Sequence, residues 1–307
     1  DPATGWVFDF SEIERAMSQV AKRDLDDIRF AQAQVRNFAE KQKAALKDVE
    51  VEDVKTGEVL ALSQYPSFDP NDYGKSNPDD LWVRAVTTPY TPGSVQKVLT
   101  LSALIDMGLI TPTTVVKVPA QLKSGDQMIG GSGVPDGTRL YARGVLAKSS
   151  NTGTILLARK ADANALRQYY VNFGLGARTG VGLPGEVTGT LAGENMPGYT
   201  RDGTAFGGSA VSVTLLQEAA AIAGIANGGV YNAPRLIQSI TQPDGSSTEP
   251  ATPAPRRVVS SETSADLMSM METMAQQSVG HTFDVQGYRV GAKTGTSRKY
   301  VQSCHCF

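Results

Sequence analysis

The sequence of 307 residues predicts an α+β fold. Two observations favour this class: long segments of strong helix formers occur near both ends and in the later half of the chain, and β-rich runs lie between them. The length exceeds the usual size of one domain, so one large domain with an appendage and two separate domains are both compatible with it. In either arrangement the chain can bury a substantial core.

The first third of the chain predicts a helical segment followed by a hairpin. Residues 11–48 are rich in Ala, Glu, Lys, Gln and Arg, so we expect one helix, or two that meet near residues 23–27. Two β-rich runs then flank Lys55-Thr56-Gly57, which predicts a hairpin with glycine at its turn. After a polar loop, the helix breakers Pro92-Gly93 and the apolar run behind them predict a helix that begins close to Ser94.

The middle of the chain predicts short strands and then two further helix boundaries. Residues 115–139 have strand and loop character, and one helix should end and another begin within residues 149–154. Residues 214–226 combine strong helix formers with an apolar face, and Asn227-Gly228-Gly229 supplies the C-terminal stop.

The last part of the chain predicts a loop, a helix and a strand. Residues 241–255 are rich in Pro, Ser and Thr and predict a mobile loop. Residues 260–277 predict a capped helix whose methionines fill the core. Residues 288–300 predict a strand that carries Lys293-Thr294-Gly295-Thr296.

Composition excludes some classes of function. The net charge of −2 and the isoelectric point near 5.8 provide no basic stripe, so nucleic acid is not an expected partner. No run of about 18 apolar residues is present that could span a membrane. The opening "DPATGWVFDF" lacks the basic start of a signal peptide, so any targeting segment of a secreted or anchored protein lies outside this sequence.

Two cysteines, Cys304 and Cys306, flank His305 near the C-terminus. Three interpretations remain open: unpaired loop thiols, a small C-x-C disulfide, or part of a metal site. Two thiols and one histidine make an incomplete zinc set with an unusual spacing, so we predict no metal.

The pair Ser94 and Lys97 raises the first question about chemistry. On a helix these positions lie about one turn apart on one face. One interpretation is an N-cap serine followed by a solvated lysine, because serine is a preferred cap. The other is a buried lysine with a lowered pKa that takes a proton from the serine hydroxyl. The S-x-x-K pattern alone is too short to decide between them.

Two further motifs favour the catalytic interpretation. S-x-N occurs at Ser149 and Asn151, and K-T-G-T occurs at Lys293–Thr296. S-x-x-K, then this motif, then K-T-G, in that order, is the signature of penicillin-binding proteins and serine β-lactamases, with serine here in place of the aspartate of S-D-N. An earlier K-T-G copy, Lys55–Gly57, precedes the serine motif and is expected to be only a hairpin turn.

More of the chain resembles the class B penicillin-binding proteins, and among them the cell-division transpeptidases. The resemblance covers roughly residue 25 to the end, which predicts a transpeptidase domain over 25–307 and a remnant of an N-terminal pedestal or linker over 1–24. Thr91 and the stretch "FGGSAVSVT" depart from the family pattern. The stretches that carry the resemblance are "DVKTGEVLALSQYPSFDPN", "TPGSVQKVLT", "AKSSNTGT", "GLPGE", "SVTLLQ", "IANGGVYNAPRLI" and "GAKTGTS".

The resemblance implies the penicillin-binding-protein/serine β-lactamase-like transpeptidase fold, in which helices flank a central antiparallel sheet beside an all-helical subdomain. In that family two more strands and a helix follow the K-T-G strand. Only residues 297–307 follow Thr296, so we expect the sequence to be incomplete at its C-terminus. The membrane anchor and pedestal of the family are expected outside this sequence.

The resemblance also implies a mechanism. Ser94 would attack a D-Ala-D-Ala stem peptide and form an acyl-enzyme, and neutral Lys97 would be the general base. Ser149 would pass the proton to the leaving amine, and Asn151 would hold Lys97 and the substrate amide. Lys293 would add positive potential, and the hydroxyls of Thr294 and Thr296 would bind the terminal carboxylate in a substrate-binding segment that includes Gly295. The backbone amides of Ser94 and Thr296 would form the oxyanion hole.

The implied function is a septal peptidoglycan D,D-transpeptidase at the extracytoplasmic face of the bacterial membrane, inhibited by β-lactams. Expected partners are stem peptides or lipid-linked precursor strands, a membrane glycosyltransferase and other division proteins, with no cofactor. The alternatives are a β-lactam-binding sensor or a non-catalytic division scaffold. A serine β-lactamase is less favoured, because Glu186 and Glu194 lie in glycine-rich loops where structural roles are expected.

Overall fold

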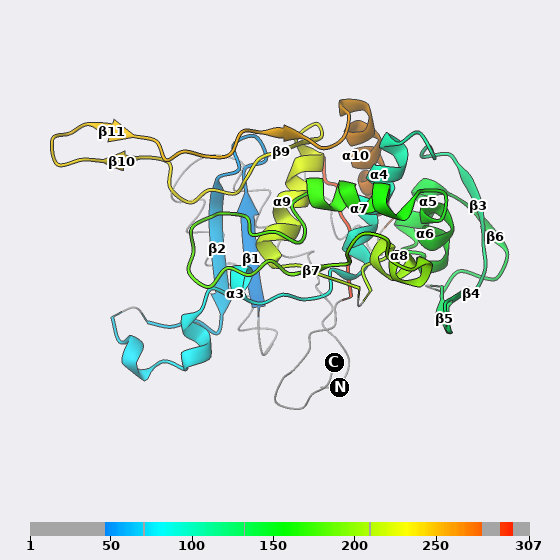
Figure 1. Cartoon of the computed structure of the whole chain (residues 1–307), viewed down its shortest axis with the longest axis horizontal. Helices are drawn as coiled ribbons and strands as arrows, with labels where there is room; N and C mark the ends of the chain where they lie inside the picture. Colours follow the sequence, from blue (N-terminus) through cyan, green and yellow to red (C-terminus); the bar gives the residue numbers. More distant parts are fainter. Residues whose placement is uncertain (1–46, 70, 132, 209, 278–288, 297–307) are drawn as a thin grey trace.

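The computed structural model of the chain in Figure 1 describes residues 47–69, 71–131, 133–208, 210–277 and 289–296. Most of the helix predicted over 11–48, and the two cysteines, lie outside these residues. The prediction is wrong for residues 47 and 48, which begin the strand β1 (Lys47–Glu52). None of the helices in the described part of the chain is both long and apolar enough to cross a membrane.

The predicted hairpin is confirmed. Strands β1 (Lys47–Glu52) and β2 (Val59–Tyr65) pair antiparallel. The early K-T-G copy forms their turn, where Gly57 has a φ of +73°. A Cβ at this glycine would lie 2.5 Å from the carbonyl oxygen of Ala233, so the position requires glycine. Helix α9 (Leu215–Ala226) packs against β1 (Figure 1).

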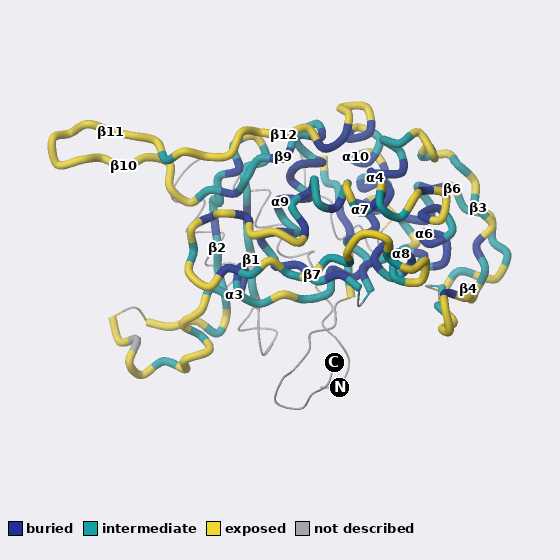
Figure 2. The backbone as a smooth tube through the Cα atoms, in the orientation of Figure 1, coloured by how far each residue is buried: buried dark blue, intermediate teal, exposed yellow. Residues whose placement is uncertain are grey.

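The predicted all-helical region is confirmed as well. Helix α4 runs through its middle and contacts each of the surrounding helices. Its residues Leu101 and Leu104 are fully buried in the main core cluster. Figure 2 shows buried backbone gathered here. The helices of this region are α4 (Gln96–Asp106), α5 (Ala142–Ala147), α6 (Asn151–Ala158), α7 (Ala163–Asn172), α8 (Gly198–Ala205) and α10 (Ser261–Gln276).

The helix boundaries follow from local capping. The Thr214 hydroxyl accepts from the Gln217 amide, and the Gln217 side chain accepts from the Thr214 amide, which together form a capping box for α9. Ser260 caps α10, whose Met270 and Met271 lie in the core as predicted. The sequence therefore locates these helices correctly.

In the part of the chain that the structure describes, ten further short strands form five separate two-stranded ribbons. The sequence predicts a loop over 241–255, and this prediction is wrong for part of the segment. Strands β10 and β11 form an exposed hairpin there, which projects from the body (Figures 1 and 2). The pairs are β3 (Val115–Val118) with β6 (Thr138–Tyr141), β4 (Gln121–Ser124) with β5 (Gln127–Gly130), β7 (Thr190–Leu191) with β8 (Val211–Ser212), β9 (Val230–Tyr231) with β12 (Arg256–Arg257), and β10 (Ile240–Thr241) with β11 (Ser247–Thr248).

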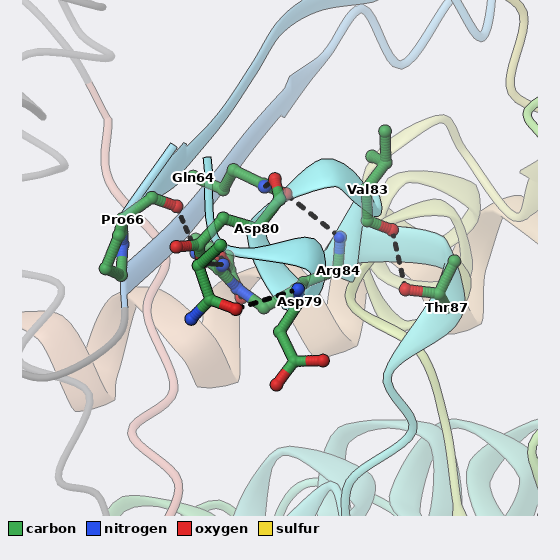
Figure 3. A network of polar contacts seen from close by, with 9 residues as sticks. Gln64, Pro66, Asp79, Asp80, Val83, Arg84 and Thr87 are labelled. Atoms are coloured by element: carbon green, nitrogen blue, oxygen red, sulfur yellow. Dashed lines mark hydrogen bonds and ion pairs between the residues drawn. The ribbon is translucent and has the colours of Figure 1, made fainter. Parts of the chain in front are cut away.

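A buried arginine holds the loop after β2 in place (Figure 3). Arg84 begins the short helix α3 (Arg84–Thr87), and its guanidinium lies 2.9 Å from an Asp48 oxygen and 3.3 Å from an Asp80 oxygen. It also donates to the carbonyl of Pro66 at 3.1 Å. Because a buried arginine needs several partners, this network fixes the loop that contains the 3₁₀ helices η1 (Tyr73–Lys75) and η2 (Pro78–Leu81).

The strand predicted over 288–300 is not found in the described residues. Residues 289–295 form no strand, and Thr296 forms only an isolated bridge. The Ala292 amide donates to the Met271 carbonyl of α10 at 3.3 Å. A strand requires a neighbouring strand for its backbone groups, whereas here a helix accepts one of them. The expected central sheet is therefore represented, within the described residues, by β1 and β2 alone.

A buried carboxyl group between α9 and the segment before α4 predicts pH-dependent stability. Glu218 accepts a hydrogen bond from the Tyr90 hydroxyl at 2.5 Å, and burial raises its pKa from the ordinary 4.5 to about 7. As the pH rises, the Glu218 carboxyl group loses its proton in the unfolded chain at a lower pH than in the folded chain. The free energy of unfolding should therefore fall by roughly 3 kcal/mol between about pH 4.5 and pH 7. In Glu218→Gln this contribution should disappear.

Urea unfolding at pH 5 and pH 7.5 measures the effect. Burial also raises the pKa values of Glu50 and Glu52, so the variant should keep the part of the pH dependence that belongs to these two residues. Glu262→Gln, at an exposed position of α10, is the control and should behave as the wild type. An unchanged slope in Glu218→Gln would contradict the prediction.

Candidate active site

The nucleophile candidate lies on a tight turn at the entrance to the central helix. Ser94 occupies the 3₁₀ helix η3 (Gly93–Val95), which leads directly into α4. Pro92 is the cap residue, and no side chain caps the turn. Ser94 is half-buried, and Lys97, one turn later, is completely buried at 0% exposure. The interpretation as a capping serine with a solvated lysine is therefore wrong.

Four oxygen atoms surround the amine of Lys97. Its Nζ lies 2.8 Å from Ser94 Oγ and 2.7 Å from Asn151 Oδ1. The Ser149 carbonyl and hydroxyl oxygens lie at 2.6 and 3.2 Å. A carbonyl oxygen can only accept, so Asn151 and Ser149 take two amine hydrogens. A neutral amine then has its lone pair available for the Ser94 hydroxyl proton.

The electrostatics favour this neutral form. Burial, and secondly the positive charge of Lys293, lower the pKa of Lys97 well below its ordinary value of 10.5. No carboxylate accepts from the Lys97 amine among the described residues. The amine can therefore accept a proton from a serine.

Ser149 is placed by a strained backbone between α5 and α6. Its φ is +53°, in the left-handed region that residues other than glycine seldom adopt. The Ser150 hydroxyl accepts from the Gly153 amide and caps α6, which begins at Asn151. This turn directs both Ser149 oxygens and the Asn151 amide to the same lysine. Strain of this kind typically accumulates at functional sites.

The K-T-G-T segment closes another side of the site. Lys293 Nζ lies 3.1 Å from Ser149 Oγ and 2.6 Å from the Thr294 carbonyl oxygen. Burial lowers the pKa of Lys293 to about 8. The side chains of Thr294 and Thr296 are exposed, so they are open to a ligand. The structure thus brings together Ser94, Lys97, Ser149, Asn151 and Lys293, with Thr294, Gly295 and Thr296 beside them.

Glycines allow the backbones around Ser94 to touch, and sequence reasoning did not identify this role. A Cβ on Gly93 would lie 2.3 Å from the Thr296 carbonyl oxygen, and one on Gly207 would lie 1.8 Å from the Gly93 carbonyl oxygen. Gly295 would meet Val95 at 3.0 Å. The only sequence signal for Gly207 was its place in "FGGSAVSVT", the stretch that departs from the family pattern.

The two acidic residues after S-x-N show no geometry of a deacylating base. The Glu186 carboxylate accepts from the Thr179 amide at 2.6 Å and the Gly180 amide at 3.3 Å, so it closes its own loop. Glu194 is exposed in the loop before α8. These contacts agree with the structural roles that the sequence predicts.

The arrangement has the parts needed for acyl transfer through a serine. It combines the Ser94 hydroxyl beside an amine of lowered pKa, the Ser149 hydroxyl between two lysine amines, and the exposed hydroxyls of Thr294 and Thr296. The backbone amides of Ser94 and Thr296 belong to segments in direct contact, as an oxyanion site built from two chain segments requires.

The sequence of the chain is similar to known proteins. A family model described as penicillin binding protein transpeptidase domain matches residues 49–306. The chain is 37% identical over 295 residues to penicillin-binding protein PbpB of Mycolicibacterium smegmatis, covering 92% of this chain and 45% of the relative. It is 31% identical over 264 residues to peptidoglycan D,D-transpeptidase FtsI of Escherichia coli, covering 86% and 42%.

Solved structures agree with these sequence matches. A crystal structure of penicillin binding protein 3 from Mycobacterium tuberculosis, complexed with aztreonam, superposes with a TM-score of 0.85 at 35% identity. The match covers 92% of this chain and 65% of that one. The chain spans about half the length of the curated relatives it matches.

Proposed function

The chain belongs to the penicillin-binding protein transpeptidase family, among the class B members that act in cell division, and we propose that it is a peptidoglycan D,D-transpeptidase. One observation carries the proposal: Lys97 is completely buried, no carboxylate among the described residues pairs with it, and its amine lies 2.8 Å from Ser94 Oγ. A general base must lie within hydrogen-bond distance of the hydroxyl whose proton it takes, and burial favours the neutral amine that can take it.

The first step forms the acyl-enzyme. Ser94 Oγ attacks the carbonyl carbon between the two D-alanines of a stem peptide, and its proton moves to Lys97 Nζ. The carbonyl oxygen becomes an oxyanion that accepts from the backbone amides of Ser94 and Thr296. Each such donor contributes roughly 3 kcal/mol to stabilising the transition state.

The second step breaks the peptide bond and joins two stems. The carbon–nitrogen bond cleaves, and the proton passes from Lys97 through the Ser149 hydroxyl to the leaving D-alanine amine. An amine of a second stem peptide then attacks the ester and loses its proton to Lys97. Ser94 Oγ departs and is protonated again, so the sum is amide exchange with no cofactor. The Asn151 amide holds Lys97 throughout, from 2.7 Å.

Substrate selection rests on the cationic edge. The Lys293 ammonium supplies positive potential, and the exposed hydroxyls of Thr294 and Thr296 donate to the terminal carboxylate of the stem. Gly295 allows the segment to lie against the nucleophile turn. The ring carboxylate of a penicillin would bind in the same way.

The context of this activity is also part of the proposal. Residues 25–307 would make up the transpeptidase domain and residues 1–24 the end of a pedestal or linker. The protein would act at the extracytoplasmic face of the cytoplasmic membrane in septal wall synthesis, held by an anchor outside this sequence. Its macromolecular partners would be a membrane glycosyltransferase and other division proteins.

The test is intact-protein mass spectrometry after incubation with a penicillin, followed for hours, with Ser94→Ala as the matched control. We expect a one-to-one adduct on the wild type, located at Ser94 by peptide mapping, and none on the variant. Rapid drug consumption without an adduct would indicate a β-lactamase. A folded wild type without an adduct would overturn the proposal.

A further inference from the structure

A buried hydrogen-bond network connects the back of the nucleophile helix to the turn beside Ser94. Thr100, on α4, is fully buried, and its Oγ1 lies 2.7 Å from the Ala205 carbonyl oxygen and 2.8 Å from the Tyr170 hydroxyl. It also lies 3.1 Å from the carbonyl oxygen of Gln96, one turn earlier in the same helix. Three helices, α4, α7 and α8, therefore meet at this one hydroxyl.

The direction of these hydrogen bonds follows from the chemistry of the groups. A threonine hydroxyl has one hydrogen, and the two carbonyl oxygens can only accept. Tyr170 must therefore donate to Thr100 Oγ1, which leaves the threonine hydrogen for the shorter contact with Ala205. Burial raises the pKa of Tyr170, so its hydroxyl stays protonated and able to donate.

The network continues to the active site through the end of α8. Ala205 is the last residue of α8, and two residues later the Gly207 carbonyl accepts from the Gly93 amide at 3.1 Å. The backbone of Gly93 is in close contact with those of Thr296 and Gly207. A Cβ on Gly93 would lie 2.3 Å from the Thr296 carbonyl oxygen, and a Cβ on Gly207 would lie 1.8 Å from the Gly93 carbonyl oxygen. Whatever fixes the Ala205–Gly207 turn thus also fixes the peptide before Ser94.

We propose that Thr100 and Tyr170 are positioning residues, which hold the Ala205–Gly207 turn so that the Ser94 and Thr296 amides point together at the oxyanion. The inference rests on the proposed acyl-transfer function. Neither side chain touches the reacting atoms, so the effect should appear in the rate of bond formation and leave the initial binding of the β-lactam unchanged.

The first measurement needs no reaction. Hydrogen exchange of the Gly93 amide is followed by NMR on protein labelled with ¹⁵N-glycine, in the wild type, Thr100→Val and Thr100→Ser. Valine keeps the shape of threonine but cannot hold Ala205 or Tyr170, so we expect exchange at Gly93 to accelerate about tenfold. Serine retains the hydroxyl and should restore the slow exchange.

Ser102→Ala is the matched control. Ser102 lies on the same helix and is equally buried. It is not part of the network, because its hydroxyl donates to the Leu99 carbonyl oxygen at 2.8 Å. Its removal should leave Gly93 exchange unchanged. Unchanged exchange in Thr100→Val would overturn the inference, whether or not the chain reacts with β-lactams.

The second measurement is stopped-flow acylation by a chromogenic β-lactam, well below the melting temperature of each variant. In Thr100→Val we expect the maximal acylation rate to fall about 10- to 100-fold while the half-saturating concentration stays the same. Tyr170→Phe should lower the rate in the same direction, and the double variant should lose less than the product of the two effects.

The outcomes separate this inference from the function on which it rests. A wild type that is never acylated means that the proposed function fails, and the inference fails with it. A reactive wild type with equal rates in Thr100→Val and Ser102→Ala, or no recovery in Thr100→Ser, overturns the inference alone and leaves the function intact.

Discussion

Replacing Lys97 by methionine should slow the acylation of Ser94 by a β-lactam about 10³- to 10⁴-fold. Methionine fills a similar volume, but its sulfur is too weak a base to take the proton of the Ser94 hydroxyl, whose Oγ lies 2.8 Å from the Lys97 amine. The measurement is the second-order acylation rate constant from intact mass against time. Circular dichroism confirms that the variant is folded.

Two further variants show whether Lys97 acts as a base or only as a structural group. Lys97→Arg keeps donors for Asn151 and Ser149 but remains protonated, so it should lose as much activity as the methionine variant. Lys160→Met, at an exposed lysine just after α6, is the control and should react as the wild type. Substantial activity in Lys97→Arg would show that Lys97 is not the base.

Replacing Lys293 by alanine should lower the acylation rate about 10²- to 10³-fold and change its pH dependence. In the wild type the rate should rise as Lys97 loses its proton, and it should fall again near pH 8 as Lys293 loses its own. Lys293→Ala should lack the alkaline limb. Its acidic limb should move to higher pH, because the charge that helps to lower the pKa of Lys97 is gone.

Lys293→Arg is the informative companion. Arginine stays charged at all accessible pH values, so the alkaline limb should move well above pH 8 while the acidic limb stays in place. Rates measured from pH 5 to pH 10 test this. An alkaline limb that remains near pH 8 in the arginine variant would assign that limb to a different group.

Several elements were predictable because their causes are local. Thr214 and Gln217 form a capping box four residues long, and Gly57 forms a hairpin turn between two β-rich runs. The order of S-x-x-K, S-x-N and K-T-G depends only on the chain. These signals located helix α9, the β1–β2 hairpin and the candidate site residues. They did not predict that residues 289–292 lie against α10 without forming a strand.

The sequence by itself determined which residues could do the chemistry, because motif order and residue type are properties of the chain. Only the tertiary structure decided the state of those residues. The pKa of Lys97 is lowered because the fold buries its amine completely and brings Lys293 near it. Gly207 and Thr100 matter because folding brings them against Gly93 and Ala205, and desolvation and backbone contact between distant segments leave no local pattern in a sequence.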